Sequence, residues 1–140
     1  MTDNNHAIAN ARAWAASIHE AMTAYQQLDS GEAETVDYEG EAFDDSDALR
    51  QRIEEMPLSV QVRGGWYSPG DYRGQSERQA EEFEILLSTG GPALRITGDI
   101  GGAASLQWQD WGTPWTDYRD TTDGQDEAIA AFVGLFYLED

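Results

Sequence analysis

The sequence contains no cysteine and no lysine. The lack of Cys excludes disulfides and Cys-ligated metals, and it leaves the redox compartment undetermined. All eight basic residues are Arg, against 27 Asp and Glu residues, so the formal net charge is −19. A protein with this field repels nucleic acid and anionic membranes, and it attracts basic surfaces. We therefore expect neither direct nucleic-acid binding nor membrane binding.

Targeting signals are also missing from the chain. The N-terminus has no basic segment followed by an apolar core, so it does not match a signal peptide. No apolar run approaches the roughly 18 residues that a membrane span needs. These two absences predict a soluble cytoplasmic protein.

Residues typical of catalysis are scarce. His6 and His19 are the only histidines, and the chain has neither a Gly-x-Ser-x-Gly elbow nor a Gly-rich phosphate loop followed by Lys. The Gly-Gly pairs stand at the ends of expected strands, where turn geometry explains them. The sequence therefore predicts no catalytic residues, no cofactor and no enzymatic activity.

What the sequence has in excess is acid, concentrated in the segment 29–47. Nine of these nineteen residues are Asp or Glu, and none is Lys, Arg or His. A run of like charge repels itself and resists compaction. The segment can form a disordered tail, a solvated face, or a surface shaped for a cationic partner. The residues able to anchor it to a core are Ala33, Val36, Tyr38, Ala42 and Phe43.

A calcium loop is one interpretation of the end of this segment. Counting from Asp44 places Glu55 at the twelfth position, as such a loop requires. However, the sixth position is Leu49, where the sharp turn needs Gly, and the fifth is Ala48. We therefore expect no specific metal site.

Apolar residues at three-to-four spacing predict three helices. Asp45 or Ser46 can cap the second helix, and Pro57 ends it. Asp123 or Asp126 can cap the third. The predicted bounds are residues 5–28, 45–56 and 125–137.

Period-two alternation between short Gly-rich turns predicts four strands within residues 58–111. Leu58, Val60 and Val62 fall on one face of the first strand, and Pro114 is expected to end the sheet. Short links favour an antiparallel meander. The chain thus reads as a single α+β domain, residues 1–140, with the N-terminal helices and the C-terminal helix packed on a four-stranded antiparallel sheet.

Two sets of aromatic and aliphatic residues are expected to form the hydrophobic core. Phe83, Ile85 or Leu87 should meet Phe132 or Phe136 between the sheet and the last helix. Most of the remaining rings should fill the sheet face, with one or two left for a protein interface. These rings are Trp66, Tyr67, Trp108, Trp111, Trp115 and Tyr118.

The charge is the strongest functional signal. Duplex DNA presents one negative charge per about 1.7 Å of helix axis. A folded domain with many fixed carboxylates can offer a DNA-binding protein a comparable density and release counterions from its basic channel. Solubility and adaptation to a high-salt cytoplasm are competing explanations, and a GC-rich genome also accounts for the absence of Lys.

Several segments resemble a family of short uncharacterised proteins encoded in proteobacterial genomes, phages and plasmids. They are VQVRGGWYSPGDY, EFEILLSTGGPALRITGDI, LQWQDWGTPWTDYR and the closing FYLED. The likeness covers roughly residues 58–140 and implies no catalytic residues. In size, charge and lack of catalytic motifs, the chain is also similar to anti-CRISPR and antirestriction proteins that mimic DNA.

The leading hypothesis is a non-enzymatic inhibitor of host defence, an anti-CRISPR protein that acts as an acidic DNA mimic. It would occupy a basic DNA-binding surface of a host complex, for which a type I CRISPR surveillance complex is the expected target. The alternatives are a mobile-element accessory protein that binds a basic partner without mimicry, a salt-adapted small protein of other activity, and a small enzyme. The candidate partner-binding residues are Glu32, Glu34, Asp37, Glu39, Glu41, Asp44, Asp45 and Asp47, with a second patch of Asp117, Asp120, Asp123 and Asp126.

Overall fold

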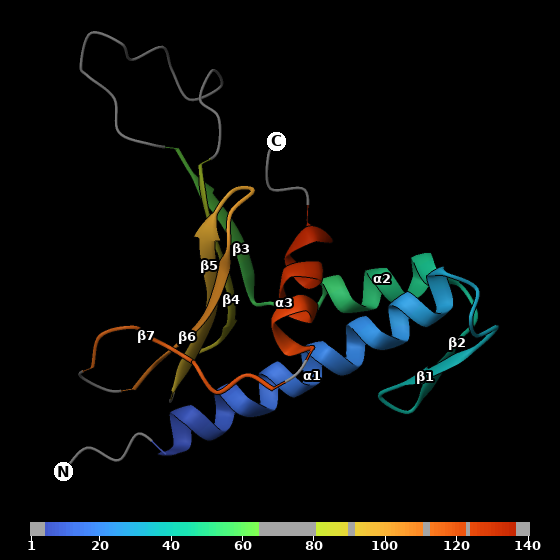
Figure 1. Cartoon of the computed structure of the whole chain (residues 1–140), viewed down its shortest axis with the longest axis horizontal. Helices are drawn as coiled ribbons and strands as arrows, with labels where there is room; N and C mark the ends of the chain where they lie inside the picture. The colour runs from blue at the N-terminus through green and yellow to red at the C-terminus, as the bar shows by residue number, and fades with distance from the viewer. Residues whose placement is uncertain (1–4, 65–80, 90–91, 111–112, 123, 137–140) are drawn as a thin grey trace, which may run out of the picture.

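A computed structural model of the chain describes residues 5–64, 81–89, 92–110, 113–122 and 124–136. Within these ranges the fold is α+β, with three helices, a five-stranded antiparallel sheet and a separate two-stranded hairpin (Figure 1). The expected fold class is confirmed. The expected count of four strands is wrong, because one strand of the sheet and both strands of the hairpin were not foreseen.

The helix α1 (Asn5–Asp29) is the longest element of the described chain. Its buried residues recur every three or four positions, so one face of the helix points into the core. The bounds lie close to the predicted 5–28. The buried face is formed by Ala7, Ala11, Ala15, Ile18, Ala21, Met22, Ala24 and Leu28.

The helices α2 (Ser46–Glu54) and α3 (Gln125–Gly134) begin in different ways. Asp45 is the N-cap of α2, and its side chain accepts a hydrogen bond from the backbone N–H of Asp47 at 3.0 Å. The N-cap of α3 is Gly124, which offers no side-chain acceptor. The expected capping by Asp45 is therefore confirmed and that by Asp126 is wrong, while Asp123 lies outside the described residues.

The large sheet is an antiparallel meander in chain order. It comprises β3 (Ser59–Arg63), β4 (Glu82–Ser88), β5 (Ala93–Asp99), β6 (Ala104–Gln109) and β7 (Thr116–Asp117). Pro114 does not end it: Thr113 donates its backbone N–H to the carbonyl of Asp110 at 3.1 Å, and the chain then returns beside β6. A two-residue strand shows no alternation, so the sequence pattern gave no sign of β7.

One face of the sheet is covered by α1 and α3 and forms the core. The helix α2 packs on α1 and β2 instead, so the expectation that both N-terminal helices pack on the sheet is wrong for α2. Phe83, Ile85 and Leu87 of β4 are buried in the core in one cluster with Phe132 of α3. The rings of Phe132 and Phe136 pack edge to face with centroids 5.3 Å apart. The core predicted between the sheet and the last helix is thus confirmed for these residues.

Among the other rings, Trp108 and Tyr118 are buried, as expected for residues that fill the sheet face. Trp115 is half-buried on the opposite face, where its ring centroid lies 4.2 Å from the guanidinium carbon of Arg95. The predicted roles of Trp66, Tyr67 and Trp111 fall outside the described residues.

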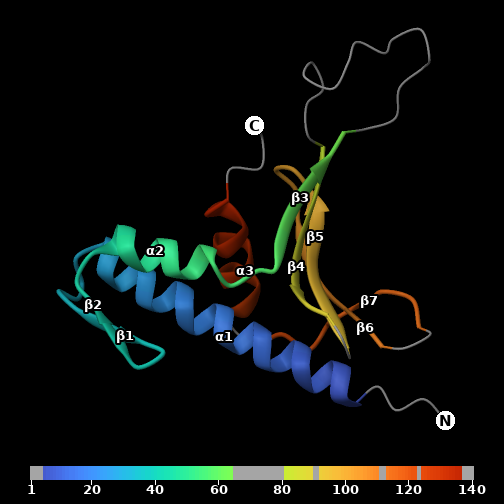
Figure 2. The same ribbon diagram turned by 180° about the vertical axis from the view of Figure 1, so that it is seen from behind.

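The acidic segment folds into a β-hairpin rather than a disordered tail. The strands β1 (Val36–Tyr38) and β2 (Glu41–Phe43) pair with Val36 opposite Phe43, and Glu39-Gly40 forms the two-residue connection. Glu39 and Gly40 have φ values of 52° and 80°, the positive values that a type I′ hairpin turn requires. Figure 2 shows the hairpin beside α2 and the C-terminal half of α1, away from the sheet.

Candidate partner-binding surface

All eight carboxylates predicted for partner binding in the acidic segment are exposed. The fold gathers them on the β1–β2 hairpin, on the chain that enters it, and at the start of α2. We call this set the hairpin patch. It comprises Glu32, Glu34, Asp37, Glu39, Glu41, Asp44, Asp45 and Asp47.

The hairpin is fixed to the body of the molecule by two aromatic residues. Tyr38 and Phe43 are only 3% and 9% exposed, and both belong to the main core cluster. The Tyr38 hydroxyl donates a hydrogen bond to Met56 Sδ at 3.4 Å. Of the five expected anchors, Ala42 is wrong because its side chain is exposed. The carboxylates therefore stand on an ordered support.

A single arginine of α2 completes this attachment. The Arg52 guanidinium forms an ion pair with Glu39, and its central carbon lies 6.0 Å from the centroid of the Tyr38 ring. Since the Arg52 and Glu39 side chains are 38% and 52% exposed, the pair gains little net energy. Its main consequence is positional, because it ties the tip of the hairpin to the helix.

The pKa of Tyr38 is shifted by burial and by the negative charges around it. Burial, followed by the charge of Glu39, raises the pKa of Tyr38 to about 12, and Arg52 opposes this shift. Glu20 of α1 contributes in the same direction as Glu39. Glu20 therefore belongs to the electrostatic surroundings of the hairpin patch. The sequence gave no signal for it, because it is an isolated acid on a distant helix.

The members of the hairpin patch differ in what they do for the fold. Glu39 holds Arg52, and Asp45 caps α2. Asp47 lies in the first turn of α2, where the helix dipole favours negative charge. Among the described residues, Glu39 is the only member of the patch in an ion pair with an Arg. The patch consequently presents net negative charge to solvent.

The second predicted patch is less uniform. Asp117 is half-buried on β7, where it accepts a hydrogen bond from Gln107 Nε2 at 2.8 Å and lies 3.4 Å from a guanidinium nitrogen of Arg119. Asp120 and Asp126 are exposed, and Asp123 lies outside the described residues. We call Asp117, Asp120 and Asp126 the loop patch.

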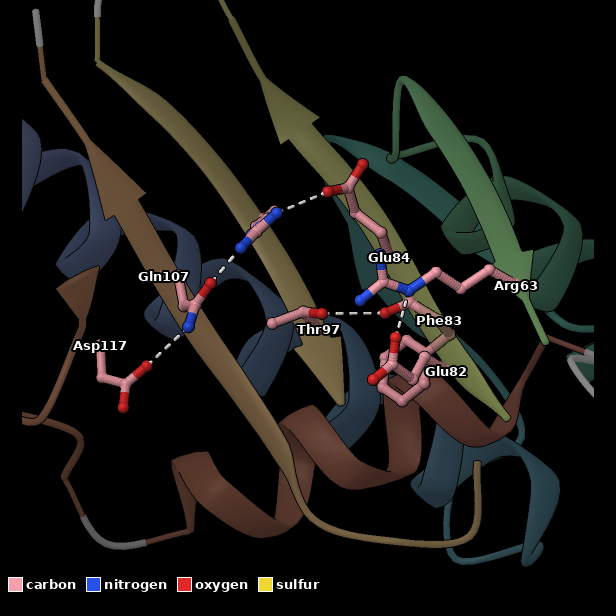
Figure 3. A network of polar contacts seen from close by, with 8 residues as sticks. Arg63, Glu82, Phe83, Glu84, Thr97, Gln107 and Asp117 are labelled. Carbon is pink, nitrogen blue, oxygen red and sulfur yellow. Dashed lines mark hydrogen bonds and ion pairs between the residues drawn. The ribbon is translucent and has the colours of Figure 1, made fainter. Parts of the chain in front are cut away.

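Asp117 is the last member of a polar network that crosses the outer face of the sheet (Figure 3). Arg95 connects its two sides: one guanidinium nitrogen donates to Gln107 Oε1 at 2.8 Å and another lies 2.7 Å from Glu84 Oε2. Because these hydrogen bonds and the nearby arginines compensate its charge, Asp117 is a weaker candidate for partner binding than the hairpin carboxylates.

The structure does not merge the two patches into one surface. In both Figure 1 and Figure 2, β7 lies on the sheet side of the molecule, and the hairpin lies beyond α3 on the opposite side. A single partner surface that covers the hairpin patch therefore does not include Asp117 on β7.

Hollows occur on the sheet side of the molecule, and two of them are lined by described residues. One, of about 240 Å³, lies on the outer sheet face beside Arg63, Glu82, Glu84 and Arg95. The other, of about 500 Å³, lies beside β6 and the start of α3 and includes Asp117, Arg119 and Asp126. Both are lined by acids together with arginines, so neither presents charge of one sign.

Candidate residues for catalysis or metal binding have the following positions. His19 is half-buried beside Gly124, the N-cap of α3. The two residues are so close that the Cβ of any side chain at position 124 would lie 3.0 Å from His19 Nε2. His6 is exposed near the start of α1. Among the described residues, no group of three or more His, Asp or Glu side chains is arranged to hold a metal ion.

No helix in the described ranges combines the length and the apolar character needed to cross a membrane.

No protein-family model, curated protein or solved structure matches the chain in the comparisons with known proteins.

Proposed function

We propose that this protein is a non-enzymatic inhibitor of a host defence complex and acts as an acidic DNA mimic. In this proposal the hairpin patch occupies a basic surface on which the complex binds DNA. The observation that carries the proposal is the gathering of eight exposed carboxylates on and beside an ordered hairpin. Among the described residues, Glu39 alone of these carboxylates is in an ion pair, with Arg52.

Fixed carboxylates suit this role for an entropic reason. A flexible acidic tail loses conformational freedom when it binds, and that loss offsets part of the electrostatic gain. The hairpin loses less, because Tyr38 and Phe43 already hold it against the core. Its carboxylates would displace the counterions of a DNA-binding channel as phosphates do, which makes binding strongly salt-dependent.

The partner is defined by its chemistry. It carries Lys and Arg side chains arranged to contact phosphates, and it acts in the cytoplasm of the bacterial host. A type I CRISPR surveillance complex meets this description, and it is the target we propose to test first. Asp120 and Asp126 of the loop patch are exposed and would contribute to long-range attraction.

An interference assay in cells tests the proposal. The chain is expressed in a strain whose type I CRISPR system targets an infecting phage, and phage plating is compared with that in a strain lacking the system. We expect the wild-type chain to restore plating only where the system is active. Unchanged plating would contradict the proposed target.

Variants of the hairpin patch show whether the carboxylates are responsible. The combined replacements Asp37→Lys, Glu41→Lys and Asp44→Lys avoid Glu39 and Asp45, which stabilise the fold. This variant should lose the restored plating. Full activity in the variant would instead favour a protein that binds its partner without DNA mimicry.

The matched control places the same three charge changes elsewhere on the surface. Glu81, Asp99 and Glu127 are exposed acids outside the acidic segment and outside both patches. Replacing each by Lys gives the same net charge as the hairpin variant. The control variant should retain most of the restored plating.

A further inference from the structure

The edge strand β3 leaves apolar side chains uncovered. Leu58, Val60 and Val62 are 61%, 39% and 42% exposed, and they are the large hydrophobic residues with high exposure in the described chain. Val60 lies opposite Ile85 and Val62 opposite Phe83 in the register with β4. Since Ile85 and Phe83 are buried, the exposed side chains lie on the core-facing side of the sheet, beyond the cover of the helices.

The backbone of β3 is also unpaired on one side. Within the described residues, β3 pairs with β4 alone and forms one edge of the sheet. The outer row of N–H and C=O groups of an edge strand is available to pair with another strand. Proteins usually protect such edges with charged side chains, proline, a bulge or an inward-pointing charge. In residues 59–63 the only charged side chain is Arg63 at the end of the strand, there is no proline, and the register with β4 is regular.

The two edges of the sheet differ in this respect. The opposite edge ends in β7, which has two residues, one of them Asp117. Residues 57–64 carry Arg63 and no carboxylate, in a chain whose net charge is −19. Two copies of this chain repel each other over most of their surface. They can approach with less repulsion where their β3 edges meet.

From the edge position, the exposed apolar face and this local absence of acid, we infer that β3 is a homodimer interface. The β3 strands of two copies pair antiparallel about a twofold axis at Val60. This register places Val60 against Val60 of the second copy, and Leu58 against Val62, so that each apolar side chain meets another. The two five-stranded sheets become one continuous sheet across the interface.

Other registers fit less well. A shift of one residue would place Val60 opposite Gln61, so that the apolar side chains of the two copies would point to opposite faces of the joined sheet. A shift that centres the pair on Gln61 keeps the faces matched but leaves Leu58 without an apolar partner and sets Ser59 opposite Arg63. The arrangement centred on Val60 is therefore favoured.

Salt should strengthen this association. Each copy carries a net charge of −19, and added salt screens the repulsion between them. Binding of a basic partner to the hairpin patch has the opposite dependence, because salt weakens it. The salt response therefore distinguishes the homodimer from the proposed inhibitory complex, and either can fail without the other.

Sedimentation velocity of the full chain tests the inference over a wide range of protein concentrations, at low and at high salt. We expect a monomer–dimer equilibrium that shifts toward the dimer as salt increases. Val60→Glu should abolish the dimer, because it sets two carboxylates against each other at the axis. Thr116→Glu adds the same charge to the opposite edge strand, where the residue is exposed, and should leave the equilibrium nearly unchanged.

Circular dichroism shows whether the variants are folded. Since Val60 is partly exposed in the monomer, Val60→Glu should keep the helical and strand signals of the wild type. A wild-type chain that stays monomeric at high concentration and high salt would overturn the inference.

Discussion

Glu39, at the tip of the β1–β2 hairpin, forms an ion pair with Arg52 of α2. The hairpin belongs to the acidic segment 29–47, which has no basic residue of its own. Arg52 also lies near the ring of Tyr38, the buried aromatic residue of β1. One cation thus positions the segment and neutralises only a small part of its charge. The acidic segment is therefore both ordered and negatively charged, as the proposed mimicry requires.

Removal of this cation should loosen the hairpin. We expect Arg52→Ala to lower the free energy of unfolding by no more than about 1 kcal/mol, because the ion pair is exposed. The local effect should be larger: amide hydrogen exchange within residues 36–43 should become faster. Arg119→Ala, which removes a more exposed arginine from Asp117, serves as the control. Equal protection of the hairpin in both variants would show that Arg52 does not hold it.

The buried phenol of Tyr38 should make stability fall at high pH. The pKa is raised from 10.0 to about 12 in the folded protein, so the hydroxyl ionises first in the unfolded chain. This stabilisation is fully present below pH 10 and is lost as pH rises through about 12. Denaturant titrations should show a smaller loss of stability in Tyr38→Phe than in wild type across that window. Identical pH profiles would mean that Tyr38 is not buried as described.

The packing of α3 depends on Phe132. Its side chain is fully buried in the core, so truncation to Ala should lower the free energy of unfolding by about 3–5 kcal/mol. Phe136 is only partly buried, and Phe136→Ala should cost clearly less. Urea denaturation measures both values. Equal and small losses would show that α3 is not docked on the sheet.

The elements that the sequence predicts well are those with long periodic patterns. The helix α1 and the alternating strand β4 bury residues at the predicted spacing, and Asp45 caps α2 as expected. The strands β1, β2 and β7 have three, three and two residues, too few to establish a period. The hairpin turn was also not predicted, because its first residue is Glu39. Asn, Asp or Gly normally occupies such a position of positive φ.

The sequence predicted which residues belong to the candidate site, but it did not predict how they are arranged. The sequence identified the carboxylates of the hairpin patch, but it did not show that Tyr38, Phe43 and Arg52 fix them in place. It also grouped Asp117 with its acidic neighbours, although Asp117 is engaged by Gln107 across the sheet. Such contacts join residues that are distant in sequence, so charge patterning alone does not reveal them.

Competition with target DNA tests the central claim most directly. A purified type I surveillance complex is titrated with labelled target duplex and with wild type or either triple-lysine variant, at about 50 mM and about 200 mM salt. Fluorescence anisotropy reports the bound DNA, and a titration without the complex controls for direct binding of the chain to DNA.

Wild type should displace the duplex, and its affinity for the complex should fall steeply between the two salt concentrations. The variant carrying Asp37→Lys, Glu41→Lys and Asp44→Lys should compete much more weakly than the one carrying Glu81→Lys, Asp99→Lys and Glu127→Lys, although their net charges are equal. Affinity that is independent of salt, or a complex that holds the duplex and this protein together, would contradict DNA mimicry by the hairpin patch.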